Sequence, residues 1–124
     1  VTTHFYKLLK EKYRSYEFAM EVRHESWMNE DSYTLMAKYN VAFVISHSGN
    51  HFPYSEVVTT KNIYFRFHGP GSLYNTKYDD ATLKKYSRLF RKWLNAGHKL
   101  WIFFNNDWYG YGIDNALTLR KFLK

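Results

Sequence analysis

The segment Asn62-Ile-Tyr-Phe-Arg-Phe-His68, which ends at Gly69-Pro70-Gly71, has the length and the aromatic content of a β-strand. Two comparable apolar segments, Val41-Ala-Phe-Val-Ile-Ser46 and Lys99-Leu-Trp-Ile-Phe-Phe104, lie before and after it in the chain. Continuous apolar runs of this length are typical of strands that are buried on both faces of a parallel sheet. Residues 17–24 predict a shorter, fourth strand at the start of the series.

Amphipathic segments separate these strands and predict helices. Residues 4–14 and 31–40 carry apolar side chains at helical spacing, and Asp31-Ser32 is a suitable N-cap for the second segment. The clearest helix begins at Asp79-Asp80 and ends before Gly97, a favourable C-cap. Asp114 is the expected cap of a last helix that continues to Lys124.

Alternation of strands and helices predicts βα units and a mostly parallel sheet. Four units in 124 residues correspond to about 31 residues per unit, which is the repeat length of a (β/α)₈ barrel. We therefore expect residues 1–124 to form a single α/β domain that is half of a TIM-like barrel. Such a half leaves two strand edges open, so we expect a second copy or a missing N-terminal half to cover them.

Composition limits the chemistry and the partners of this chain. It has no cysteine, which excludes disulfides, thiol catalysis and Cys-based metal sites within these residues. The net charge of +7 favours an anionic partner. No apolar run approaches the roughly 18 residues of a membrane span. The sequence begins at Val1 without a charged and then apolar leader, so we expect a cytoplasmic location.

Polar side chains gather where the predicted strands end. Because strand side chains alternate between two faces, residues two positions apart share a face. Three strand ends carry such pairs, namely Glu21 with Arg23, Arg66 with His68, and Asn105 with Asp107. Ligands bind at the carboxyl ends of the strands in parallel α/β folds, so the three pairs predict one site. The alternative is a layer of ion pairs and hydrogen bonds inside a barrel.

Each of these residue types has a functional and a structural interpretation. Glu21 and His68 could transfer protons or bind a divalent metal, or they could be held in structural contacts. Arg23 and Arg66 could bind a phosphate or a carboxylate, or form salt bridges. Residues 105–107 could orient a metal or substrate hydroxyls, or cap a strand.

Other polar features give weaker indications. The Gly69-Pro70-Gly71 segment lacks the full phosphate-binding signatures and favours a turn. His47 and His51 have the spacing of metal ligands, but the loop residues between them favour solvated histidines. The basic residues between Lys84 and Lys92 favour a solvated helix face over a nucleic-acid surface.

Three ordered blocks of the sequence resemble the YecE-like family, domain of unknown function 72. The blocks are Glu21-Val-Arg-His-Glu-Ser-Trp27, Arg66-Phe-His-Gly69 and Phe104-Asn-Asn-Asp107. The resemblance implies a TIM-like barrel of roughly twice this length, with this chain as strands five to eight, and it implies no established activity. It adds four motif positions to the strand-end pairs, namely His24, Trp27, Gly69 and Asn106.

These observations lead to one functional hypothesis and two alternatives. We expect the assembled barrel to bind an anionic, phosphorylated or polyhydroxylated small molecule at the carboxyl ends of its strands. Glu21, His68 and Asp107 would be the catalytic candidates of a hydrolase or isomerase, with or without a divalent metal. The first alternative is a nucleic-acid-binding module that uses the interleaved aromatic and basic residues 63–68. The second is a noncatalytic half that only completes a barrel.

Overall fold

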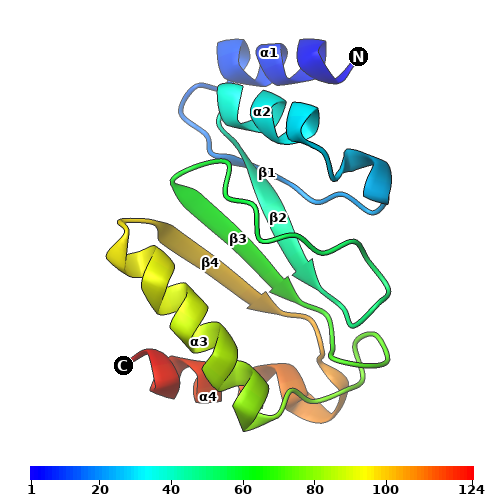
Figure 1. Cartoon of the computed structure of the whole chain (residues 1–124), viewed down its shortest axis with the longest axis vertical. Helices are drawn as coiled ribbons and strands as arrows, with labels where there is room; N and C mark the ends of the chain where they lie inside the picture. Colours follow the sequence, from blue (N-terminus) through cyan, green and yellow to red (C-terminus); the bar gives the residue numbers. More distant parts are fainter.

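The computed structural model covers residues 1–124 and contains one parallel sheet with four helices (Figure 1). The strands pair in the order β1-β2-β3-β4, so each strand lies beside its neighbour in sequence. The strands are β1 (Phe18–Met20), β2 (Val41–His47), β3 (Asn62–Phe67) and β4 (Lys99–Phe104). The helices are α1 (Thr2–Lys12), α2 (Glu30–Lys38), α3 (Asp80–Asn95) and α4 (Tyr111–Leu123). Two 3₁₀ helices complete the chain, η1 (Glu25–Trp27) and η2 (Trp108–Gly110).

This architecture confirms the predicted fold class, an α/β half of a TIM-like barrel with four parallel strands, but the second of the four predicted strand-and-helix units lacks its helix. All three strand pairs are parallel, and helices connect the strands except between β2 and β3, which a long loop joins. Helix α3 contacts α4 and β4, and α2 contacts β2 (Figure 1). None of the four helices is long and apolar enough to cross a membrane.

Several predicted boundaries differ from the structure, including those of α1, which spans Thr2–Lys12 rather than residues 4–14. Three of the differences have a clear physical reason. The first strand ends at Met20, because only Phe18–Met20 pair with β2 and the chain then turns into η1. Helix α2 begins earlier than expected, because the Asn29 side chain accepts a hydrogen bond from the Ser32 amide at 2.9 Å. Helix α4 also begins early, after Gly110, and the predicted cap Asp114 instead forms an ion pair with Lys77 at 3.0 Å.

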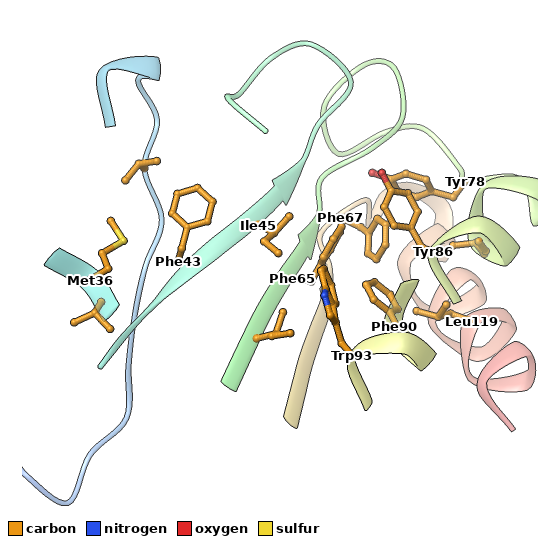
Figure 2. Packing of buried hydrophobic residues seen from close by; sticks show 14 of the residues in the cluster. Met36, Phe43, Ile45, Phe65, Phe67, Tyr78, Tyr86, Phe90, Trp93 and Leu119 are labelled. Atoms are coloured by element: carbon orange, nitrogen blue, oxygen red, sulfur yellow. The ribbon is translucent and has the colours of Figure 1, made fainter. Parts of the chain in front are cut away.

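The hydrophobic core lies between the sheet and its helices (Figure 2). Phe65 and Phe67 of β3 are fully buried on this face and pack with Phe90 of α3. The parallel register places Ile45 and Ile102 beside Phe65 on the same face. Burying aromatic side chains supplies much of the free energy that holds such a layer together.

The opposite face of the sheet corresponds to the interior of a complete barrel. It carries the alternate residues of the strands, including Tyr64 of β3 beside Trp101 of β4. The rings of Tyr64 and Phe103 stack with their centroids 4.8 Å apart. Trp101 and Phe103 nevertheless remain 42% and 41% exposed, so this face is not closed by the chain itself.

Candidate functional site at the carboxyl ends of the strands

Glu21 is the hub of a polar cluster on the open face of the sheet. Its Oε2 accepts a hydrogen bond from Arg66 Nη1 at 2.5 Å and lies 3.3 Å from Arg23 Nη2. Its Oε1 accepts hydrogen bonds from Ser46 Oγ at 2.5 Å and from His68 Nε2 at 3.1 Å. One carboxylate therefore joins side chains that come from, or directly follow, three adjacent strands.

The register of the sheet brings these side chains together. Ser46 of β2 pairs with Arg66 of β3, so both side chains lie on the open face. His68 directly follows β3, and its amide donates a hydrogen bond to the carbonyl of His47 at 2.8 Å. Asn105 directly follows β4, and its Oδ1 accepts a hydrogen bond from Arg66 Nε at 3.0 Å. The predicted convergence at the ends of the strands thus includes Asn105.

The surroundings of Glu21 keep its carboxylate ionised. Burial alone would raise its pKa, but hydrogen bonds from Ser46 and His68 oppose this effect. The positive charges of Arg66 and Arg23 act in the same direction, so the pKa of Glu21 falls below its usual value. The cluster is therefore built around a fixed negative charge.

His68 is neutral in the same environment. Burial lowers its pKa, and the positive charges of Arg66 and Arg23 lower it further. Together these effects exceed the opposing effect of Glu21, which raises the pKa. Because an ionised carboxylate only accepts hydrogen bonds, the contact with Glu21 assigns the ring proton to His68 Nε2. The other nitrogen, Nδ1, then carries a lone pair, and it is buried without a hydrogen-bond partner. The rings of Phe52 and Tyr74 lie against this histidine.

A hollow of about 550 Å³ opens beside Arg66. Its polar lining consists of Arg66, Asn105 and the exposed Asp107. Aromatic residues complete the lining, and these are Tyr74, Trp108 and Tyr109. No contact joins Asp107 to Glu21, so Asp107 lies in this hollow rather than in the central cluster.

A second hollow of about 410 Å³ lies on the Arg23 side of the cluster. The Arg23 guanidinium carbon lies 3.8 Å above the centre of the Phe52 ring, which holds this side chain in place. His24 and His51 also line this hollow. The His24 ring accepts a hydrogen bond from the Ser26 amide at 3.2 Å and thereby caps η1.

Three predicted residues lie apart from the cluster and make structural contacts. Asn106 is fully buried, and its amide group donates hydrogen bonds to Asn115 Oδ1 and to the Thr76 carbonyl. Gly69 adopts a φ of +125°, where a Cβ would lie only 2.7 Å from a backbone oxygen, so glycine is needed for the turn. Trp27 packs against the hydrophobic core. Their predicted role in ligand binding remains a prediction.

The prediction that His47 and His51 are solvated loop residues is wrong for His47. This residue ends β2, is half-buried and lies 2.8 Å from the Tyr78 hydroxyl through Nδ1. Burial lowers its pKa, and the charge of Lys85 adds to this effect. His51 is exposed, as expected.

The structure also bears on two other predictions. The nucleic-acid alternative depended on the aromatic residues within 63–68. Of these, Phe65 and Phe67 are fully buried and cannot stack on bases, whereas Tyr64 is partly buried on the open face. No group of three or more His, Asp or Glu side chains in this chain has the geometry to hold a metal ion.

Sequence reasoning missed several residues of the site. Ser46 could have been recognised as a polar residue at the end of an otherwise apolar strand. Phe52 and Tyr74 lie in loops, where periodicity gives no indication of direction. Trp108 and Tyr109 directly follow the third motif block, but their position beside Arg66 depends on the turn in η2.

A half-barrel of parallel strands with a polar cluster at their carboxyl ends defines the class of this protein. The chain belongs to the family described as Protein of unknown function DUF72, which it matches over residues 2–124. This result confirms the family resemblance that the three sequence blocks indicated. A search of curated proteins finds no match.

Solved structures of this family have the same fold. A DUF72 family protein from Thermotoga maritima is 31% identical to the chain with a TM-score of 0.82, and the match covers 98% of this chain and 51% of that protein. A DUF72 family protein from Enterococcus faecalis is 20% identical with a TM-score of 0.83, covering 98% and 52% of the two chains. The chain thus spans about half the length of these relatives.

Proposed function

We propose that the carboxyl ends of the strands bind a small phosphorylated molecule that carries hydroxyl groups. The observation that best supports this proposal is the charge of the Glu21 cluster. Arg23 and Arg66 contribute two positive charges, Glu21 contributes one negative charge, and His68 is neutral. The cluster therefore keeps one net positive charge, and hollows open on both sides of it.

Arg66 has the free donors that an anion requires. Its Nε and Nη1 donate to Asn105 and Glu21, whereas its Nη2 has no partner in this chain. The guanidinium group is partly exposed and lines the larger hollow. A phosphate in this hollow would accept hydrogen bonds from Nη2, and Asp107 would accept hydrogen bonds from ligand hydroxyls.

Glu21 and His68 would supply the proton-transfer chemistry of a hydrolase or isomerase. The ionised Glu21 carboxylate would accept a proton from a bound ligand, and the neutral His68 donates a hydrogen bond from Nε2 that stabilises the ionised state of Glu21.

We further propose that a second four-stranded half covers the open face of the sheet. The match to only half of the solved relatives supports a complementary half, supplied either by an N-terminal segment or by a second copy. Mass measurement of the chain by light scattering tests the second possibility. A monomer at all concentrations would contradict a homodimer and leave the N-terminal half as the covering element.

Thermal unfolding in the presence of sugar phosphates tests the binding proposal. A ligand at about ten times its Kd should raise the melting temperature by about 5 °C, because it stabilises only the folded state. Arg66→Gln should abolish this rise. Arg88→Gln removes the same charge from the exposed surface of α3 and is the matched control, which should keep the rise. The proposal fails if sugar phosphates and inorganic phosphate leave the melting temperature unchanged.

A further inference from the structure

Three aromatic side chains line the hollow beside Arg66 and remain open to solvent. Tyr74, Trp108 and Tyr109 are 45%, 59% and 82% exposed. They come from two different loops, one after β3 and one after β4. Exposed aromatic rings that gather at one hollow are typical of binding surfaces, because each ring offers a flat face at a small cost in side-chain entropy.

Two of these three residues have an unfavourable backbone conformation. Tyr74 and Tyr109 have φ angles of +66° and +52°, in the left-handed region that non-glycine residues rarely adopt. The only other non-glycine residue in this region is Asn40, a residue type that tolerates it well. Such conformations gather at functional sites, where neighbouring structure imposes them.

Hydrogen bonds between the loops impose this arrangement. The Trp108 amide donates to the Tyr74 carbonyl at 3.3 Å, which joins the loop after β4 to the loop after β3. The Tyr74 amide in turn donates to the His68 carbonyl at 2.6 Å. The aromatic residues are therefore connected through the backbone to the residue that contacts Glu21.

Two of the residues that line the same hollow carry polar groups without partners in the chain. The Asp107 carboxylate forms no side-chain hydrogen bond or ion pair, and the amide nitrogen of Asn105 has no partner. These two groups offer an acceptor and a donor to a ligand beside the aromatic rings. A heteroaromatic base needs this combination, since it presents a flat face together with an edge of N–H and C=O or ring-nitrogen groups.

We infer that Tyr74, Trp108 and Tyr109 form a stacking site for the base of a nucleoside phosphate. This inference rests on the proposed function, because it assigns the phosphate of the same ligand to Arg66. A sugar phosphate without a base would leave the exposed rings uncovered. A base would stack on the rings, and its polar edge would meet Asp107 and Asn105.

Isothermal titration of the chain with matched ligands tests the inference. Adenosine 5′-monophosphate and guanosine 5′-monophosphate share the phosphate and the ribose of ribose 5-phosphate and differ by the base. At least one nucleotide should bind at least tenfold more tightly than ribose 5-phosphate. Equal affinities would overturn the stacking site and leave the proposed function intact. Absence of binding by all three compounds, and by other sugar phosphates, would overturn both.

Variants of Tyr109 separate ring stacking from folding. Tyr109→Gly suits the positive φ, so the chain should remain folded while the tenfold preference for the nucleotide falls to near one. Tyr109→Phe keeps the ring and should retain the preference. Asn40→Gly makes the same backbone change away from the hollow and should leave all affinities unchanged. A nucleotide preference that survives in Tyr109→Gly and in Trp108→Ala would contradict the inference.

Discussion

The two faces of the four-stranded sheet differ in what covers them. On one face, Phe65 and Phe67 are buried under α3 and form the centre of the core (Figure 2). On the other face, Trp101 and Phe103 stay substantially exposed, although they belong to the adjacent strand. The chain thus supplies helices for only one side of its sheet. In a closed barrel the opposite strands fill the second side, and this requirement explains why the open face carries large aromatic residues.

The polar cluster belongs to the open face as well. Glu21 and Arg66 lie at the ends of the strands on that side, whereas the covered face is mainly apolar and has the half-buried His47 and the buried Asn106 as its polar residues near the strand ends. The hydrophobic core and the proposed ligand site therefore lie on different faces of one sheet. Substitutions on the two faces should have different consequences.

The largest expected effect on stability is at the covered face. Phe67→Ala should lower the free energy of unfolding by about 3–5 kcal/mol, because it leaves a cavity among Phe65, Phe90 and Tyr78. Phe103→Ala is the matched substitution on the open face and should cost about 1 kcal/mol or less. Urea unfolding followed by circular dichroism measures both. Similar losses for the two variants would show that the open face is buried in solution.

A smaller effect is expected in the polar cluster. Glu21→Gln should lower the free energy of unfolding by about 2 kcal/mol, because two arginine side chains lose their shared carboxylate. The control is Glu11→Gln in α1, whose exposed ion pair with Lys7 at 3.8 Å should contribute less than about 0.5 kcal/mol. Urea unfolding at neutral pH measures the loss in both variants. An equal loss of stability in Glu21→Gln and Glu11→Gln would contradict the role of Glu21 as a hub.

Acid should destabilise the chain through one histidine on each face. The pKa values of His68 and His47 are lowered in the folded state, mainly by burial. The unfolded chain therefore binds more protons below the ordinary histidine pKa of 6.5, so stability is full above it and falls as the pH drops through the lowered values.

The pH dependence of the urea midpoint measures this effect. The midpoint should fall between pH 7 and pH 5, and His68→Gln and His47→Gln should each make the decrease shallower. His4→Gln in α1 is the control and should leave the dependence unchanged. A midpoint that is constant over this range would mean that neither histidine is held neutral by the fold.

The smallest expected effect on stability is at Trp101. Trp101→Ser should change the free energy of unfolding of the isolated chain by about 0.5 kcal/mol or less, because the side chain is already 42% exposed in the folded chain. If a second half covers this face, the same variant should weaken the association measured by light scattering. If Trp101→Ser caused a large loss of stability but no change in the mass of the assembly, the open face would contribute to the stability of the isolated chain, contrary to this expectation.

Much of the fold could be predicted because its elements have clear local patterns. The apolar and aromatic content of residues 41–46, 62–68 and 99–104 predicts strands, and the structure confirms them as β2, β3 and β4. The helix after Asp79 was predicted correctly, because this residue caps it by accepting a hydrogen bond from the Thr82 amide. Asn29 and Gly110 were missed as helix starts, since short polar segments offer several possible caps.

The sequence by itself determined the alternation of strands and helices, the half-barrel class and the polar residues at the strand ends. These properties depend on residues that are close in the chain, so the spacing of apolar and polar residues in the sequence is enough to predict them. Only the tertiary structure decided that Glu21 is the hub, because its partners Ser46, Arg66 and His68 lie 25, 45 and 47 residues away. The register between strands sets those contacts. The fold of two loops similarly decided that Tyr74 and Tyr109 meet at one hollow, since local pattern carries no information about contacts between distant loops.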